Sequence, residues 1–238
     1  MKQVKRKLVL GSGGIFFEHE SDPILDHIFS LVDDKSHMKM VYLPTAGHDN
    51  HSMEDTVRDY CLRHGFEDAV SLYLTDESLT PEYIRDTILS ADVIYACGGN
   101  LMFLLDTWRK TGADVWLKQA YEQGTVLAGQ SSGAMCWCRR GYDNCGENGS
   151  FMFLDGLDLI PYILCPHFED WPFFLEDVKG QNLDALGLDN DIVISIVDGE
   201  YTVVDSGRNP LHSAFWMPAA ENYAVTDLMV KHVKLNDL

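Results

Sequence analysis

Ser131 is the residue whose surroundings are best suited to covalent chemistry. It is the central residue of the segment Gly-Gln-Ser-Ser-Gly at 129–133, with a glycine two positions away on either side. The preceding residues 125–128 form a short apolar run typical of a buried strand, and a helix is expected from about Ala134. Gly-x-Ser-x-Gly between a strand and a helix predicts a nucleophile elbow, a sharp turn that exposes a serine hydroxyl. A glycine-rich loop without chemistry is the alternative interpretation of the pentapeptide.

The two glycines have a physical reason at such a turn. A non-glycine residue there usually has a strained backbone, and neighbours without a Cβ relieve the crowding around it. Free N–H groups at the start of the following helix would point at the hydroxyl, where an oxyanion would form. The segment therefore predicts acyl-transfer chemistry.

A serine nucleophile needs a base, normally a histidine that is oriented by a third group. Of nine histidines His167 is best placed, because it follows the apolar run 158–165 and a proline that limits backbone freedom. Asp143 and Glu147 lie in the loop between the serine and the histidine, and the residue pattern leaves both open as the orienting acid. Each of these residues alone could be structural or solvated, but their combination with the elbow favours catalysis.

Strands must bring these residues together. The apolar pattern predicts strands at 7–10, 38–43, 69–74, 93–96 and 125–128, separated by helices at 23–32, 52–64, 80–90, from 101 and at 114–123. This alternation predicts an α/β fold with a doubly wound, mostly parallel sheet between helices. Ligands bind beyond the carboxyl ends of such strands, where Gly98, Gly99 and Ser131 all fall.

The pattern is looser after Arg140. We expect a polar loop at 141–149, a strand at 158–165, a helix within 173–186 and a hairpin formed by 192–197 and 201–204. Strand-like segments at 214–217 and 223–225 suggest an antiparallel C-terminal extension of the sheet. No linker or repeat divides the chain, so residues 1–238 are expected to form a single domain.

Composition excludes several classes of partner. The formal charge of −19 argues against nucleic acid and anionic membrane surfaces, and no apolar run is long enough to span a membrane. The first seven residues do not resemble a signal sequence, and the six cysteines are not spaced as a metal site or a disulfide scaffold. A reduced, cytoplasmic protein is therefore expected, and the choice between monomer and homodimer stays open.

We expect neither a cofactor nor a metal. The glycine-rich segment 11–14 lacks the Gly-x-Gly-x-x-Gly spacing of a dinucleotide site, so we interpret it as a loop that passes close to the site. His48 and His51 have no evident third ligand nearby, which favours solvated loop histidines.

Four motifs occur in a recognisable order: Cys-Gly-Gly-Asn at 97–100, Gly-Gln-Ser-Ser-Gly-Ala at 129–134, Asp143, and Pro-His-Phe at 166–168. In these motifs the chain resembles the aspartyl dipeptidase (peptidase E) family of serine peptidases, which is related to cyanophycinase. The resemblance covers about residues 8–204 and is strongest from 93 to 168. It implies a flavodoxin-like α/β sandwich related to class I glutamine amidotransferases.

The resemblance also implies roles. Ser131 matches the nucleophile and His167 the base, while Gly99 matches the backbone oxyanion donor, with the Ser132 amide as the second. Asp143 matches the third triad residue if the loop contains a small gap. Glu147 fits nearly as well by spacing, and Asp143 is preferred.

The implied reaction is hydrolysis of a peptide bond in a small peptide through an acyl-enzyme. Relatives act on dipeptides with an N-terminal aspartate and on aspartyl polymers, and Arg139, Arg140 and Arg208 are candidates to bind an acidic substrate. An ordinary α/β-hydrolase has its acid and histidine much later in the chain. A glutamine amidotransferase needs cysteine at the elbow, and Cys136 is a turn too late. The alternative from another class is a non-catalytic small-molecule-binding or regulatory protein with the same fold.

Overall fold

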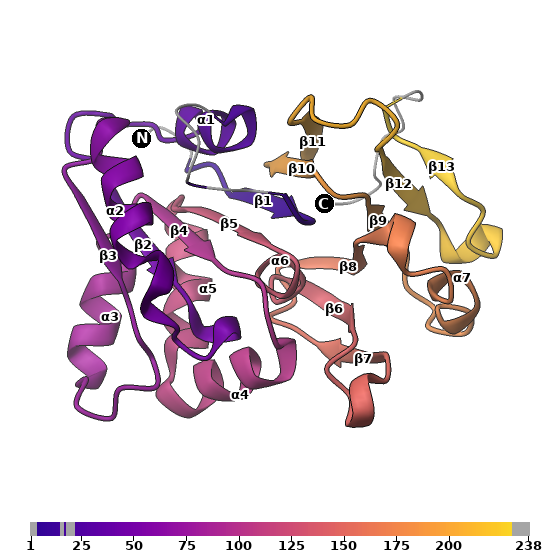
Figure 1. The fold of residues 1–238 in the computed structure, drawn as a ribbon, viewed down its shortest axis with the longest axis horizontal. Helices are drawn as coiled ribbons and strands as arrows, with labels where there is room; N and C mark the ends of the chain where they lie inside the picture. The colour runs from indigo at the N-terminus through magenta and orange to yellow at the C-terminus, as the bar shows by residue number, and fades with distance from the viewer. Residues whose placement is uncertain (1–3, 15–16, 18–21, 230–238) are drawn as a thin grey trace.

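The computed structural model describes residues 4–14, 17 and 22–229, which form two sheets with helices around the larger one (Figure 1). The first sheet has seven strands in the order β11-β10-β1-β5-β4-β2-β3. Its parallel members are β1 (Lys7–Gly11), β2 (Lys39–Leu43), β3 (Asp68–Ser71), β4 (Val93–Ala96) and β5 (Val126–Gln130). The hairpin of β10 (Ile192–Val197) and β11 (Glu200–Asp205) pairs antiparallel with β1. The predicted mostly parallel sheet and the predicted hairpin are both confirmed, and the structure places the hairpin at the edge of this sheet.

The order of the parallel strands has a regular part. Four consecutive strands lie in the order β3-β2-β4-β5, which reproduces the first four places of the flavodoxin order 2-1-3-4-5. The fifth place is taken by the first strand of the chain, β1. The carboxyl ends of β1, β4 and β5 therefore lie at one edge of the sheet.

Five helices cover the two faces of this sheet. Side chains of α1 (Pro23–Ser30) and α2 (Glu54–Arg63) pack on one face. Those of α3 (Pro81–Leu89), α4 (Leu101–Thr111) and α5 (Ala113–Gln123) pack on the other. The predicted doubly wound arrangement is thereby confirmed, since strand residues alternate between the two hydrophobic clusters.

One local signal in this region was misread. The helix expected from residue 52 begins at Glu54, because a 3₁₀ turn, His51–Met53, precedes α2, and the Asn50 side chain accepts a hydrogen bond from the Ser52 backbone amide at 2.8 Å.

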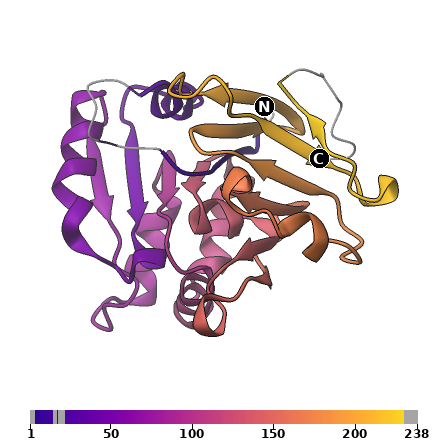
Figure 2. The ribbon, with the colours of Figure 1, turned by 45° about the vertical axis from the view of Figure 1, so that its right-hand side comes forward.

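The second sheet has six strands in the order β13-β12-β9-β8-β6-β7. Its members are β6 (Cys138–Asp143), β7 (Met152–Asp155), β8 (Ile160–Pro166), β9 (Ala185–Leu188), β12 (Ala214–Met217) and β13 (Thr226–Asp227). Its strands lie on the side of the molecule away from α2 and α3 (Figure 2).

Three predictions about this half of the chain are corrected. The polar loop at 141–149 begins as strand β6, which pairs parallel with β8. The helix expected within 173–186 is only the single turn α7 (Phe174–Asp177), and strand β9 follows it. The last strands extend the second sheet, not the first. Pairing between distant strands decides these elements, and the short segments have too weak a periodic pattern to show it.

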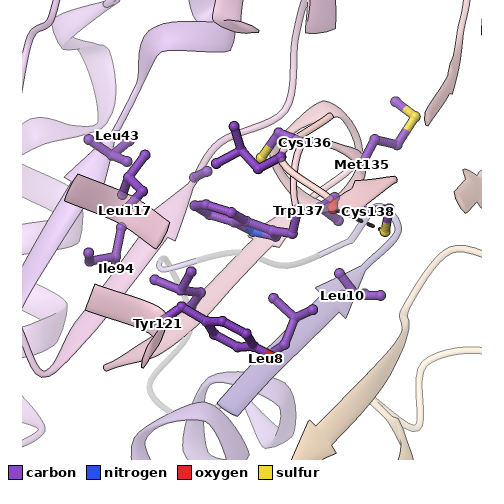
Figure 3. Close-up of a cluster of buried hydrophobic side chains, with 14 of the residues drawn as sticks. Leu8, Leu10, Leu43, Ile94, Leu117, Tyr121, Met135, Cys136, Trp137 and Cys138 are labelled. Atoms are coloured by element: carbon purple, nitrogen blue, oxygen red, sulfur yellow. Dashed lines mark hydrogen bonds between the residues drawn. The ribbon is translucent and has the colours of Figure 1, made fainter. Parts of the chain in front are cut away.

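The core continues between the two sheets beneath the Gly-x-Ser-x-Gly turn. Trp137, which directly follows this turn region, is completely buried and lies among Leu8, Leu10 and Tyr121 (Figure 3). Side chains of the second sheet, such as Leu186, belong to the same cluster. The turn therefore rests on a closely packed base, which limits how far its backbone can move.

Two composition-based expectations can be compared with the described residues. None of their helices has the length and apolar character needed to cross a membrane. Each of the six cysteines, all within the described residues, is a free thiol.

Candidate active site

Ser131 has the strained backbone that the sequence predicts. It connects β5 to the short helix α6 (Ser132–Met135) with φ +52° and ψ −122°, outside the regions that L-residues ordinarily occupy. The Ser131 amide donates to the carbonyl oxygens of Gly11 (2.9 Å) and Ser12 (3.1 Å). The turn is therefore tied to the end of β1, and the predicted passage of the glycine-rich loop close to the site is confirmed.

The glycines on either side cannot be replaced without a clash. A Cβ on Gly129 would lie 2.2 Å from the carbonyl oxygen of Gly133, and a Cβ on Gly133 would lie 2.1 Å from that of Ala96. These contacts are with backbone atoms, which cannot move aside cheaply. The close approach of β4, β5 and α6 therefore requires glycine at both positions.

His167 lies within hydrogen-bond distance of Ser131. Its Nε2 is 3.0 Å from the Ser131 Oγ, although the two residues are 36 positions apart in the chain. His167 follows β8 in a left-handed conformation (φ +51°), and its amide donates to the Ser12 Oγ at 2.7 Å. Both side chains are half-buried. This is the geometry that allows an imidazole to take the proton of an attacking serine.

The second nitrogen of the ring faces an asparagine. His167 Nδ1 is 2.7 Å from Asn190 Oδ1, and the Gly13 amide donates to the same oxygen at 3.1 Å. A backbone N–H identifies this atom as the oxygen of the amide, since the amide nitrogen could not accept from it. Nδ1 therefore carries the proton, and Nε2 presents its lone pair to Ser131.

Carboxylates surround Asn190 but do not touch the imidazole. The backbone amide of Asn190 donates to Glu169 Oε1 at 2.9 Å, and the side-chain Nδ2 of Asn190 donates to Asp170 Oδ2 at 3.4 Å. Burial raises the pKa of neighbouring Asp189 to about 6. Acidic side chains therefore contact the asparagine that orients the ring, and not the ring itself.

The assignment of Asp143 as the partner of His167 is corrected. Asp143 ends β6, is 2% exposed, and its Oδ2 lies 2.9 Å from the Ser132 Oγ. Glu147, the other candidate, lies in an exposed 3₁₀ turn. The ring nitrogens of His167 are occupied by Ser131 and Asn190, so neither predicted carboxylate orients the imidazole.

The two predicted oxyanion donors lie beside Ser131. A Cβ on Gly98 would be 3.2 Å from the Ser131 Cβ, which shows that the Gly98–Gly99 loop packs directly on the serine. Within the described residues neither the Gly99 nor the Ser132 amide has a hydrogen-bond partner. Because α6 has only four residues, these local N–H groups, and not a long helix dipole, would stabilise an oxyanion.

The arginines considered for an acidic substrate are already paired. Arg139 Nε is 2.8 Å from Asp158, and Arg140 Nη2 is 2.8 Å from Asp155. Arg208 contacts two carboxylates, those of Asp22 at 2.5 Å and Asp191 at 2.9 Å. Their charge is thus compensated within the chain.

The loop histidines have protein partners of their own. His48 packs on Phe103, and His51 stacks on Tyr73 and lies 3.3 Å from Glu54. Among residues 4–14, 17 and 22–229, no group of three or more His, Cys, Asp or Glu side chains is arranged to hold a metal ion.

Asn190 is the site residue that sequence reasoning missed. It lies two residues beyond β9, and β9 pairs parallel with β8 so that Leu188 is opposite Pro166. His167, one residue after Pro166, and Asn190, two residues after Leu188, therefore emerge at the same edge. The signal was the run Ala-Leu-Gly-Leu at 185–188, which could have been interpreted as a short buried strand.

A known protein family matches most of this chain. The profile described as Peptidase family S51 matches residues 8–204 of the chain. This chain belongs to peptidase family S51. The resemblance to the peptidase E and cyanophycinase type of enzyme is confirmed.

Relatives of this S51 chain have peptidase names. The "Uncharacterized peptidase YgaJ" of Bacillus subtilis (strain 168) is 30% identical over 174 residues, 71% of this chain and 70% of the relative. A further uncharacterized peptidase, from Pasteurella multocida (strain Pm70), is 25% identical over 203 residues, 80% of this chain and 96% of the relative. These relatives support a peptidase.

Solved structures share the fold of the S51 chain. A peptidase from an acI-B1 Actinobacterium superposes with a TM-score of 0.73 at 17% identity, covering 95% of both chains. A putative peptidase E protein from Listeria monocytogenes EGD-e has a TM-score of 0.62 at 20% identity, covering 85% of this chain and 99% of its own. At these identities the likeness concerns the mixed α/β fold.

Proposed function

We propose that this S51 chain is a serine peptidase that hydrolyses small peptides through an acyl-enzyme. The observation that carries the proposal is the 3.0 Å contact between His167 Nε2 and the Oγ of Ser131, at a strained strand-to-helix turn. We interpret this turn as a nucleophile elbow, because the strain is what lifts a serine side chain clear of the sheet. The strand order β3-β2-β4-β5 supports the flavodoxin-like architecture implied by the resemblance.

In the first step the Ser131 Oγ attacks the carbonyl carbon of the scissile peptide bond. His167 Nε2 takes the hydroxyl proton as the C–O bond forms, and the carbonyl electrons move to the oxygen. The Gly99 and Ser132 amides donate to this oxyanion. Asn190 Oδ1 holds the Nδ1–H tautomer, which leaves Nε2 free to act as the base.

The tetrahedral intermediate then collapses. His167 gives its proton to the leaving amine, the C–N bond breaks, and the acyl group remains on Ser131. Water attacks the ester with His167 again as the base, and the acid product leaves as the Ser131 hydroxyl is restored. The parts of acyl transfer are thus all supplied by side chains and amides of this chain, and we propose that no metal or cofactor takes part.

The substrate class proposed is a short peptide, with a dipeptide bearing an N-terminal aspartate as one member to be tested. The compensated arginines offer no ready cation for an acidic side chain. The panel must therefore include neutral and basic dipeptides beside acidic ones.

Hydrolysis of such a dipeptide panel by the purified protein tests the proposal. Wild type should release the amine, and Ser131→Ala should lower kcat for this release by at least ~10³-fold, because the covalent nucleophile is lost. Ser150→Ala, at an exposed serine, is the matched control and should behave as wild type. Binding of peptides without turnover would instead indicate a non-catalytic member of the fold.

A further inference from the structure

Asp143 has a place in the site other than the one predicted for it. The Ser132 Oγ lies between two oxygens, the Gly99 carbonyl at 2.7 Å and Asp143 Oδ2 at 2.9 Å. Ser132 and Asp143 are 1% and 2% exposed. These atoms form a short chain that runs from the end of β6 to the loop beside Ser131.

The number of available protons determines how these three groups are hydrogen-bonded to one another. A serine hydroxyl has a single proton, and a backbone carbonyl has none to give. If Ser132 donates to Gly99, its contact with Asp143 is a hydrogen bond only when the carboxyl group donates to Ser132. A neutral carboxylic acid at Asp143 satisfies both contacts, whereas a carboxylate would leave two acceptors competing for one proton.

Burial supports the neutral form. Asp143 Oδ1 is buried and has no hydrogen-bond partner within the part of the chain that the structure describes. Leaving one oxygen of an ionised carboxylate in this state is costly, because water can no longer solvate its charge. Burial has the largest effect and raises the pKa of Asp143, while contacts with the Ser132 hydroxyl, with the thiol and backbone amide of Cys145 and with the backbone amide of Leu101 act in the opposite direction.

Gly99, at the other end of these hydrogen bonds, has a backbone conformation that only glycine adopts easily. Gly99 has φ +148°, and a Cβ there would lie 2.1 Å from the Ala46 carbonyl oxygen. The Asn100 amide donates to this same oxygen at 2.8 Å. The peptide between Gly99 and Asn100 is thus held by Ser132 on its carbonyl side and by Ala46 on its amide side.

We propose that Asp143 is a positioning residue that acts as a neutral acid: it donates to Ser132, which donates to the Gly99 carbonyl. This chain of hydrogen bonds fixes the Gly98–Gly99 loop so that the Gly99 amide points at the developing oxyanion. The inference rests on the proposed function, because an oxyanion forms only if Ser131 acylates. It gives Asp143 a role that does not involve the imidazole of His167.

Substitution of Asp143 by asparagine and by alanine separates this role from that of a charged triad member. Asparagine is neutral and its Nδ2 can donate to Ser132, so Asp143→Asn should keep kcat within about threefold of wild type. Asp143→Ala removes the donor and should lower kcat by about 10- to 100-fold, less than the loss of a whole oxyanion donor. KM should stay within a factor of about three, because the oxyanion forms only in the transition state. Glu147→Gln, at an exposed acid nearby, is the control.

The outcomes are distinguishable. Equal losses in Asp143→Asn and Asp143→Ala would show that the charge is needed and would overturn the neutral role. A fully active Asp143→Ala would overturn positioning. If Asp143→Ala does not fold, infrared difference spectra of wild type against Asp143→Asn decide, since a protonated carboxylic acid band in wild type is required. Failure of the proposed function would appear separately, as wild type that neither hydrolyses peptides nor reacts at Ser131.

Discussion

Asn190→Ala should weaken catalysis by an amount that the geometry sets. The substitution removes the Oδ1 that lies 2.7 Å from His167 Nδ1 and 3.1 Å from the Gly13 amide. The imidazole then loses the partner that holds its tautomer and that accepts its Nδ1–H when the ring becomes a cation. Both functions belong to the transition state, so the loss should appear in kcat and leave KM largely unchanged.

The expected size follows from the charge of the partner. A hydrogen bond to an ionised group contributes about 1.5–3 kcal/mol. With about 1.4 kcal/mol for each factor of ten, this predicts a loss of about 10- to 150-fold in kcat. Removing the function of a charged triad acid costs about 10⁴-fold. The smaller value is expected here because an amide orients the ring but brings no full charge.

Asn190→Asp is the complementary variant. A carboxylate at this position would favour the imidazolium, so the acidic limb of the kcat/KM profile should move by about 1 pH unit or more to higher pH. The assay is dipeptide hydrolysis across pH for wild type and both variants, with exposed Asn144→Ala as the control. Asn190→Ala with wild-type kcat, together with an unshifted profile for Asn190→Asp, would refute the orienting role.

Three further outcomes are expected. Gly133→Ala should destabilise the fold by about 1–3 kcal/mol or more in urea unfolding, as overpacking does; Gly47→Ala, whose Cβ would meet its nearest neighbour at 3.7 Å, should be tolerated. Burial raises the pKa of Asp189 from 3.8 to about 6. Between these two pH values the folded state holds a proton that the unfolded chain has lost, so the stability of the fold decreases as the pH rises through this window. Asp189→Asn should therefore flatten the pH dependence of Tm there, and an unchanged slope would contradict the assignment. Dialysis against a chelator should leave peptide hydrolysis intact, and loss of activity that zinc restores would show that a metal takes part.

The parallel half of the fold could be predicted from sequence because local signals agree there. Strands of four or five apolar residues alternate with amphipathic helices, and Thr80 and Asn100 both cap the helices they precede. Such elements are specified by neighbours in the chain. Their order then places the ends of β4 and β5 together, so the proximity of Gly98 and Ser131 followed from topology.

The second sheet was harder because its strands depend on distant partners. Strand β9 is four residues long, includes Gly187, and is recognisable only through its parallel pairing with β8. Without β9, Asn190 had no reason to lie near His167, and the loop acids were the natural candidates for the third group. The sequence also showed that Asp143 belongs to the motif region without showing which hydroxyl it contacts.

The residue type expected for the third group contributed to the same error, because the orienting residue is an asparagine and not an acid. Four acids lie around Asn190: Asp189 and Asp191 flank it in the chain, and Glu169 and Asp170 accept hydrogen bonds from it. The amide occupies the position that the acid was expected to fill, and only side-chain geometry distinguishes the two. Resemblance to a family transfers the nucleophile and the base more securely than the third group, whose role can be filled from several strands.

Identification of the serine that a phosphonate ester modifies tests the central claim most directly. After reaction with wild-type protein, digestion and mass spectrometry should locate the adduct on Ser131. The adduct should be absent from Ser131→Ala, present in Ser132→Ala, and formed more slowly in His167→Gln, because the base that activates the hydroxyl is lost. An adduct on Ser132, or equal labelling of wild type and Ser131→Ala, would contradict the account.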